Sequence, residues 1–339
     1  MSNEPAAAKI RWGVLGVAGI AIKKVIPAMQ KGSRTEIVAI ASRDAKRAAD
    51  AAAQLGIRKS YGSYDELLAD SEIDAIYNPL PNHLHVPWSA KAAEAGKHVL
   101  CEKPIAITAG EARLLIQARD AAGVKIAEAF MVRSHPQWLR VRELVRNGAI
   151  GELRAVTSTF SYFNIDPKNI RNIAAIGGGA LMDIGCYPVT MARFLFAREP
   201  KRVIALIDRD PDMGTDRLTS AILDFAPGQA VFTCSTQLVP FQRAQIFGMR
   251  GRVEIEIPYN APPDQPTRIL IDDGSQLAGR NAHADEFPIL DQYTLQGDLF
   301  SQAIQENLEV TVPLEDAVAN MAVIEAIFRS AETGAWEQP

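Results

Sequence analysis

Residues 10–17 read Ile-Arg-Trp-Gly-Val-Leu-Gly-Val and lead directly into Ala18-Gly19-Ile20-Ala21, and this stretch decides the fold. The first part is largely apolar and predicts a buried strand, whereas the residues after Gly19 begin a helical pattern. Glycines stand at the junction, where a chain that turns sharply from strand to helix favours residues without a side chain. Strand, turn and helix in this order predict the first unit of a parallel α/β sheet.

The same alternation continues to about Met131. Short apolar runs occur at 35–42, 74–80, 98–102 and 125–131, and alanine-rich helical stretches, including 44–56 and 109–123, lie between them. Gly56, Gly96 and Gly123 stand where helix C-caps belong. We therefore predict a doubly wound Rossmann domain over residues 1–127.

The pattern changes after a helix predicted at 136–148. Segments with strand character follow at 153–164, 202–209, 217–226, 229–239, 244–258 and 267–274, with one helix, 180–196, among them. Strands without intervening helices predict an open, predominantly antiparallel sheet in a second, α+β domain over residues 128–339. Two closing helices, near 295–306 and 314–331, are expected to pack back on the body of the protein.

Composition narrows the class of protein. The 339 residues are 47% hydrophobic and 22% charged, and the net charge of -4 gives no basic field for nucleic acid or anionic lipid. The cysteines Cys101, Cys186 and Cys234 lie far apart, and no His, Asp or Glu spacing indicates a metal site. Neither a signal-peptide pattern in Met1 to Ala8 nor a long apolar run is present. We expect a cytoplasmic enzyme without nucleic-acid, membrane or metal partners.

The turn after the first strand has the context of a dinucleotide-binding fingerprint. Gly16 allows the tight turn, and the helix that begins near Gly19 and Ile20 offers backbone amides to a pyrophosphate. Ala18 stands where the fingerprint has its second glycine, so the motif is imperfect. A purely structural strand-to-helix turn is the alternative interpretation.

The end of the second strand predicts which nicotinamide cofactor binds. An acidic residue that holds the ribose 2′-hydroxyl is usual there, but this chain has Ala41-Ser42-Arg43. A hydroxyl and a guanidinium suit a 2′-phosphate, which favours NADP over NAD. Asp44 could instead bind a ribose, but its position is better explained as a helix N-cap.

Polar residues follow two further strands of the predicted sheet, at the edge where ligands of such sheets bind. These segments are Asn78-Pro79-Leu80-Pro81-Asn82-His83, followed by His85, and Cys101-Glu102-Lys103-Pro104. We predict cofactor contacts from Pro79, Asn82, His85, Glu102 and Lys103. A surface lysine before a helix-starting proline is the alternative for Lys103, and His83 is expected to start a helix rather than to catalyse.

With Arg133 in AFMVR and the stretch Gly177–Tyr187 (GGGALMDIGCY), these segments resemble the glucose-fructose oxidoreductase/inositol dehydrogenase (Gfo/Idh/MocA) family over essentially the whole chain. Many members have a histidine where Tyr187 stands, and a tyrosine there is similar to the branch with D-xylose dehydrogenase, glucose-fructose oxidoreductase and dimeric dihydrodiol dehydrogenase. Asp183 and Tyr187 are four residues apart and share one helix face. The three glycines before them would let the backbone pass close to a ligand. An ordinary half-buried helix tyrosine is the alternative.

The resemblance implies hydride transfer between NADP and the anomeric carbon of an aldose. Tyr187 is the expected general acid/base, and the nearby charge of Lys103 would lower a phenol pKa that is ordinarily near ~10. Asp183 is expected to position the sugar, Asn169 and Arg171 to line its pocket, and Arg133 to belong to the cofactor site. The resemblance also implies a homodimer or homotetramer that forms through the second sheet.

Three other functions remain open at this point. The enzyme could act on another position of a sugar, or on a dihydrodiol or dicarbonyl. It could hold NADP permanently and pass hydride between two aldoses. A non-enzymatic regulatory sensor that binds NADP is the third, although the presence of both Lys103 and Tyr187 favours catalysis.

Overall fold

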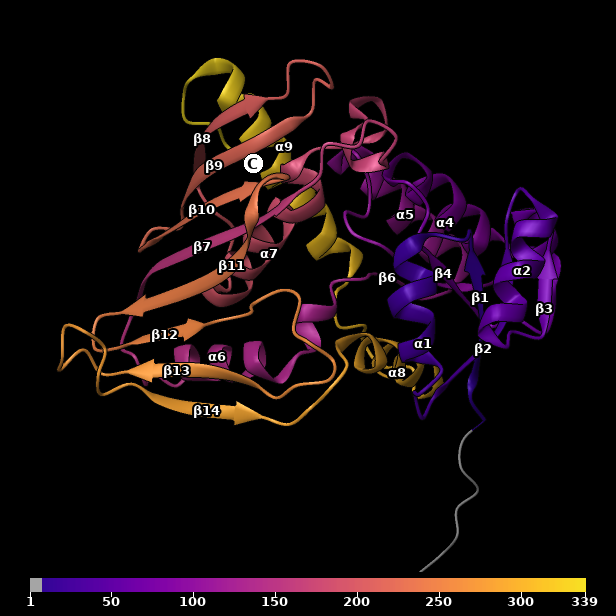
Figure 1. Cartoon of the computed structure of the whole chain (residues 1–339), viewed down its shortest axis with the longest axis horizontal. Coiled ribbons are helices and arrows are strands. Elements are labelled where there is room, and N and C mark those ends of the chain that lie inside the picture. Colours follow the sequence, from indigo (N-terminus) through magenta and orange to yellow (C-terminus); the bar gives the residue numbers. More distant parts are fainter. Residues whose placement is uncertain (1–7) are drawn as a thin grey trace, which may run out of the picture. The chain divides into compact units, whose positions relative to one another are not determined.

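The computed structural model describes residues 8–339, so most of the N-terminal stretch examined for a targeting signal lies outside the described residues. The chain forms two compact units (Figure 1). The first comprises the residues up to Ala106, Gly110–Met131 and Asp291–Ala317; the second comprises Ile107–Ala109, Val132–Leu290 and Val318–Pro339. A late segment of the sequence therefore belongs to the first unit.

The first unit is built on a six-stranded parallel sheet with the strand order β3-β2-β1-β4-β5-β6. This arrangement confirms the predicted Rossmann topology. Its strands are β1 (Ile10–Leu15), β2 (Thr35–Ala41), β3 (Lys59–Tyr61), β4 (Ala75–Asn78), β5 (His98–Cys101) and β6 (Ile126–Glu128). Its helical segments are η1 (Ala21–Val25), α1 (Ile26–Met29), α2 (Ala45–Leu55), α3 (Tyr64–Ala69), η2 (Asn82–Leu84), α4 (His85–Glu94) and α8 (Gln292–Gln305), and α5 (Ala109–Ala122) lies almost entirely within it. Gly56, Gly96 and Gly123 have the positive φ predicted for C-caps.

Helix α8 completes the first unit although it follows the second sheet in sequence. The Thr294 hydroxyl donates a hydrogen bond to the Ala28 carbonyl (2.8 Å), and the Asp298 carboxylate accepts backbone N–H groups from the turn before β2. The Phe300 ring packs against Trp12 of β1 with ring centroids 5.5 Å apart. Polar bonds and apolar packing together attach α8 to α1 and to the first two strands.

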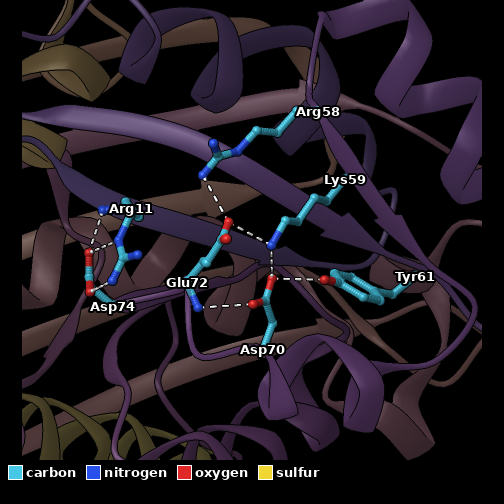
Figure 2. A network of polar contacts seen from close by, with 7 residues as sticks. All are labelled: Arg11, Arg58, Lys59, Tyr61, Asp70, Glu72 and Asp74. Atoms are coloured by element: carbon cyan, nitrogen blue, oxygen red, sulfur yellow. Dashed lines mark hydrogen bonds and ion pairs between the residues drawn. The ribbon is translucent and has the colours of Figure 1, made fainter.

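A polar network ties together the amino ends of strands in this sheet (Figure 2). The Asp70 carboxylate accepts hydrogen bonds from the Lys59 ammonium (2.8 Å), the Tyr61 hydroxyl (2.8 Å) and the Glu72 N–H (2.9 Å). Burial opposes ionisation of Asp70, but these bonds outweigh it and lower the pKa to about 2. Because ligands bind at the carboxyl ends of such strands, this network stabilises the sheet from the opposite edge.

The second unit contains an eight-stranded sheet with the order β14-β13-β12-β11-β7-β10-β9-β8. Every neighbouring pair is antiparallel except β7 and β10, so the predicted mostly antiparallel sheet is confirmed. The strands are β7 (Leu153–Phe163), β8 (Arg202–Arg209), β9 (Asp216–Asp224), β10 (Gln229–Ser235), β11 (Gln237–Gly248), β12 (Arg252–Ile255), β13 (Thr267–Asp272) and β14 (His283–Phe287).

Helices run along one face of this sheet in Figure 1. They are α6 (Pro136–Arg146), η6 with α7 (Leu181–Gly185 and Cys186–Phe196) and α9 (Leu314–Thr333). Short 3-10 turns, η3 (Met131–Ser134), η4 (Ile170–Asn172) and η5 (Ala174–Ile176), connect the elements. Side chains of β9 and β10 such as Leu223 and Phe232 are buried, whereas their neighbours on the other face are partly exposed. One covered and one open face explain the period-two pattern of these strands.

Two strand predictions were wrong in detail. The segment predicted as one strand at 244–258 is a hairpin, since β11 ends at Gly248 and β12 begins at Arg252. Residues 229–239 divide between β10 and β11. Strands β3 and β14 were not predicted, because three residues are too few for a period and HADEF has little apolar character.

Candidate active site

The turn after β1 leaves open space beside the start of a helix. Gly16 has φ +88°, and a Cβ there would come within 2.9 Å of the Leu80 side chain. A Cβ at Gly19, where the helix begins, would meet nothing within 4 Å, so the space beside the helix start is open. Because the first N–H groups of a helix have no acceptor within it, they can bind phosphate oxygens. The absence of a glycine at position 18 does not close this space.

At the end of β2, guanidinium groups are available to a ligand, whereas the one nearby carboxylate, that of Asp44, serves as a helix cap. The Asp44 side chain accepts the Arg47 N–H (3.1 Å) and caps α2, as predicted. Ser42 is nearly buried, and its hydroxyl accepts the Asp44 N–H (3.2 Å). The exposed Arg43 makes no ion pair with the described residues.

Arg47 is a second guanidinium at this edge that the sequence analysis missed. Its Nη2 donates to the Val17 carbonyl (3.2 Å), which places the charge beside the turn that follows β1. The signal was a basic residue in the first turn of α2, because that turn begins two residues after Arg43 at the end of β2. Arg43 and Arg47 thus supply two cations at the end of β2.

Lys103 follows β5 at the carboxyl edge of the sheet. The Glu102 N–H donates to the Asn78 carbonyl (3.0 Å), which holds the ends of β4 and β5 side by side. The hydroxyl of the buried Tyr77 donates to Glu102 Oε1 (2.6 Å), and the Lys103 N–H donates to Glu102 Oε2 (3.3 Å). Glu102 is therefore a fixed carboxylate that orients the start of the lysine segment.

The loop after β4 is held in place by the buried side chain of His85. His85 is 1% exposed, and its two ring nitrogens lie 2.8 Å from the Pro104 carbonyl oxygen and 2.6 Å from that of Leu80. Burial lowers the pKa of His85 to about 4, although the contacts with the two carbonyl oxygens act in the opposite direction. In this structure His85 joins the loop after β4 to the Lys103 segment. Pro79 is buried, Asn82 is half-buried and His83 lies exposed in η2.

Three predicted residues meet in the second unit. Asp183 Oδ2 accepts hydrogen bonds from Arg171 Nε (2.9 Å) and from the hydroxyl of Tyr162 (2.7 Å), which sequence reasoning did not identify. The Asn169 side chain accepts the Arg171 N–H (3.1 Å) and so fixes the turn that carries the arginine. Asn169, Arg171, Asp183 and Tyr162 form one hydrogen-bonding cluster, called the Asp183 cluster below.

Tyr187 stands one helical turn after Asp183. Only 5% of it is exposed, and its ring packs against Phe160 and Tyr259 with centroids 5.8 and 5.3 Å apart. The Tyr259 hydroxyl is hydrogen-bonded to the Ser158 hydroxyl (2.6 Å). Aromatic packing thus holds the phenol ring of Tyr187 in one orientation.

The glycines before this helix have a role that differs from the predicted one. A Cβ at Gly178 would come within 2.8 Å of the Arg171 and Ile173 carbonyl oxygens, and one at Gly179 would collide with Asp216. Gly179 also has φ +125°. At Gly178 and Gly179 the backbone therefore passes close to other parts of the protein, which explains these two glycines by packing within the second unit.

Arg133 lies in η3, at the beginning of the second unit. Its guanidinium carbon is 4.3 Å from the centre of the Phe194 ring, and that of Arg142 is 4.2 Å from the same ring. Both cations therefore interact with one aromatic side chain of α7.

Comparison with known proteins identifies the family. The model of the GFO/IDH/MocA oxidoreductase family with its NAD-binding Rossmann fold matches residues 10–130, and the GFO/IDH/MocA C-terminal domain matches residues 138–254. The chain belongs to the GFO/IDH/MocA family. Membership confirms the predicted family and fold, and it makes the protein an NAD(P)-dependent oxidoreductase.

Several known proteins are similar to this chain over nearly its whole length. An uncharacterized oxidoreductase of Rhizobium meliloti is 51% identical over 97% of this chain and 98% of its own. D-xylose 1-dehydrogenase (NADP(+)) 2 of Haloferax volcanii is 39% identical over 96% of this chain and 98% of its own. The crystal structure of KijD10, a 3-ketoreductase from Actinomadura kijaniata in complex with NADP and TDP-benzene, superposes with a TM-score of 0.87 at 30% identity, over 95% and 98% of the two chains.

Among the described residues, no helix is long and apolar enough to cross a membrane, and no group of three or more His, Cys, Asp or Glu residues could hold a metal ion. The three cysteines are buried and not paired in disulfides.

Proposed function

We propose that this protein is an NADP-dependent aldose dehydrogenase that oxidises the anomeric carbon of a sugar, or catalyses the reverse reduction. The observation that carries the proposal is the Asp183 cluster beside Tyr187, because it offers several hydrogen-bonding groups to a ligand rich in hydroxyls. The similarity to a D-xylose 1-dehydrogenase supports the same reaction.

The groups that we propose to hold NADP fit its chemistry. The start of the helix after Gly16 and Ala18 would bind the pyrophosphate, with Gly19 and Ile20 on its first turn. Ser42, Arg43 and Arg47 would bind the 2′-phosphate, for which a guanidinium is a favourable partner. Pro79, Asn82, Glu102, Lys103 and Arg133 complete the proposed cofactor site, and His85 supports it from within the loop.

When bound, the nicotinamide would accept a hydride from the anomeric carbon, or return one in the reverse direction. Tyr187 then takes the proton of the anomeric hydroxyl as that oxygen becomes a carbonyl, so that a cyclic hemiacetal yields a lactone. Lys103 hydrogen-bonds the reacting oxygen, and its positive charge favours the ionised phenol. Asp183 accepts hydrogen bonds from other hydroxyls, and Arg171 and Asn169 fix its direction.

A panel of aldoses with NADP, followed by the absorbance of the reduced nicotinamide, tests this function. Tyr187→Phe and Lys103→Ala should each lower kcat by about 10²- to 10⁴-fold, because each removes a proton-transfer or charge-stabilising group. Tyr61→Phe is the matched control, since its hydroxyl bonds Asp70 at the opposite edge of the first sheet. Near wild-type turnover in Tyr187→Phe would show that another group moves the proton.

A second candidate is reduction of a keto group elsewhere on a sugar ring, which the similarity to a 3-ketoreductase favours. Keto sugars with NADPH therefore form a second arm of the panel, and trans-dihydrodiols with NADP form a third. Turnover of keto sugars without turnover of aldoses would show that the enzyme acts on a ring keto group rather than on the anomeric carbon. An absorbance of reduced nicotinamide that stays with the purified protein through gel filtration would indicate a retained cofactor and transfer between two aldoses.

The open face of the second sheet is the proposed contact between copies of the protein. Its β8–β10 part includes Ile204, Ile222 and Val231, and Leu206 is 78% exposed. A second copy would cover these apolar side chains by the same surface, as symmetric oligomers do. Light scattering should give a dimer or tetramer for the wild type and smaller species for Leu206→Asp. A monomeric wild type at micromolar concentration would contradict this proposal.

A further inference from the structure

A cavity of about 520 Å³ lies at the end of α7 that is remote from Tyr187. All the residues that line it belong to the second unit. Tyr187 stands on the first turn of this helix and Phe196, which lines the cavity, on its last, so about 14 Å of helix separate the two. This cavity, called the α7 cavity below, is therefore distinct from the groups that the proposed mechanism uses.

The walls of the α7 cavity are fixed by contacts within the protein. The turn between β11 and β12 is joined to the segment before β7, since the Arg250 N–H donates to the Ile150 carbonyl (2.9 Å). The Phe196 ring stacks on that of Phe225 with centroids 4.3 Å apart. The cavity thus exists without a ligand, as small-molecule sites in proteins usually do.

The lining of the α7 cavity is mostly apolar. Its apolar side chains come from the ends of α6 and α7, the start of β7 and the turns beside them, and they are Val145, Leu153, Leu195, Phe196, Pro227 and Met249. Met249 is 64% exposed. A hollow of this size can take the body of a small organic molecule, since such sites measure about 300 to 1,000 Å³. A ligand there would remove exposed apolar surface from water.

Two arginines at the α7 cavity carry positive charge that no carboxylate neutralises. Arg198 Nη1 and Arg250 Nη2 each donate to a backbone carbonyl, at 3.2 and 2.9 Å, which orients both side chains. Neither guanidinium forms an ion pair with another of residues 8–339. Among the residues that line the cavity Glu152 is the one carboxylate, and it pairs with Arg154 (2.7 Å). A guanidinium has five N–H donors, so Arg198 and Arg250 keep several for a ligand.

The two carbonyls that these arginines bind suggest a second explanation. Arg198 follows the end of α7 by two residues, and Arg250 bonds the carbonyl of Gly148, two residues after α6. A cation near the C-terminus of a helix is favourable in itself. That effect accounts for the bonds to the carbonyls, but it does not account for the apolar cavity that both arginines border.

We propose that the α7 cavity binds an organic anion with an apolar body, such as an aliphatic or aromatic carboxylate or phosphate ester. Arg198 and Arg250 bind the anionic head, for which the planar fork of a guanidinium is a favourable partner. Leu195, Phe196 and Met249 contact the apolar body. This site lies outside the proposed catalytic groups and does not depend on the proposed function.

Two fluorescent probes test this inference on the whole protein. One is 8-anilinonaphthalene-1-sulfonate, and the other is N-phenyl-1-naphthylamine, which has the same apolar body without the sulfonate. Both are titrated in the presence of excess NADP, which keeps them out of the proposed cofactor site. The double variant Arg198→Gln/Arg250→Gln should bind the sulfonate about tenfold more weakly or worse, because hydrogen bonds to a charged group are lost. Its affinity for the neutral probe should stay within about twofold of the wild type.

Two further variants separate the α7 cavity from the rest of the surface. Arg280→Gln removes an exposed arginine outside the cavity and should leave both affinities unchanged. Met249→Glu keeps both arginines but adds a negative charge at the cavity, and it should weaken binding of the sulfonate.

Competition shows which anionic head the site takes. Decanoate and decyl phosphate are titrated against the bound sulfonate, and the one that displaces it at the lower concentration identifies the preferred head. Decanol, which has no charge, should displace it at least tenfold less well.

Three results would overturn the assignment. The first is a wild type that does not bind the sulfonate. The second is equal affinity of the wild type and the double variant for it, which would leave the arginines as helix caps only. The third is displacement by decanol as effective as that by the two anions, which would show that apolar contact alone drives binding. None of these results bears on the oxidation of aldoses, so failure here and failure of the proposed function are distinguishable.

Discussion

Replacement of Asp216 by asparagine should change the pH dependence of stability in a predictable direction. Asp216 is 1% exposed, and its Oδ2 accepts the Leu181 N–H (2.6 Å) and the Thr219 hydroxyl (2.9 Å). It thereby holds the start of the helical segment that carries Asp183 and Tyr187. Burial raises its pKa to about 6, although both hydrogen bonds act in the opposite direction.

The direction of this pH effect follows from the pKa of Asp216 in the folded and in the unfolded protein. The ordinary pKa of the group is 3.8, and the folded value is about 6, so the folded protein holds this proton more tightly than the unfolded chain does. The stabilising contribution of Asp216 is therefore complete below pH 3.8 and is lost as the pH rises through 6. Between pH 5 and pH 8 these two values correspond to a loss of about 1 to 2 kcal/mol. An asparagine keeps an acceptor oxygen but does not titrate.

Urea unfolding of the wild type and Asp216→Asn, followed by tryptophan fluorescence at several pH values, measures this effect. The free energy of unfolding of the variant minus that of the wild type should rise by about 1 to 2 kcal/mol from pH 5 to pH 8. Asp224→Asn, at the other end of β9, controls for the loss of a negative charge. A difference that stays constant with pH for Asp216→Asn would refute the argument that burial dominates this carboxyl group.

Three further outcomes are expected. Asp70→Asn should cost about 1 to 2 kcal/mol at pH 7 in urea unfolding, and this deficit should shrink as the pH falls from 4 towards 2, because the lowered pKa of Asp70 stabilises the fold only while the group is ionised. Arg43→Ala and Arg47→Ala should each weaken NADP binding about tenfold or more in calorimetric titrations and leave NAD binding nearly unchanged. Asp183→Asn should raise the KM for the sugar without changing NADP affinity, and an unchanged KM in steady-state assays would remove Asp183 from the substrate site.

Most of the fold followed from local patterns in the sequence. The buried parallel strands of the first sheet are continuous apolar runs, and helices with glycine C-caps separate them, so each element carries its own signal. The errors lie where that signal is weak. Strand β3 has three residues, β14 reads HADEF, and the hairpin between β11 and β12 turns within a stretch that is apolar on both sides. Such segments form strands because they pair with neighbouring strands, and this pairing is not visible in their own residue pattern.

Candidate site residues could be proposed from the sequence where they lie just after a strand. Lys103 and Ser42 were proposed because the carboxyl ends of parallel strands form the ligand-binding edge of such a sheet. The close contact of Gly179 with Asp216 could not be predicted, because a glycine that accommodates a carboxylate looks the same in a sequence as one that accommodates a ligand. Tyr162 was missed because its contact with Asp183 depends on which strand of the second sheet lies beside the helix.

Helix α8 shows the limit of sequence reasoning most clearly. Its helix pattern is that of any amphipathic closing helix, and nothing in that pattern indicates which unit the helix joins. Its place in the first unit depends on contacts with residues near the start of the chain, such as the hydrogen bond from Thr294 to the Ala28 carbonyl and the packing of Phe300 against Trp12. Contacts between segments so far apart in the chain leave no local signal in the sequence.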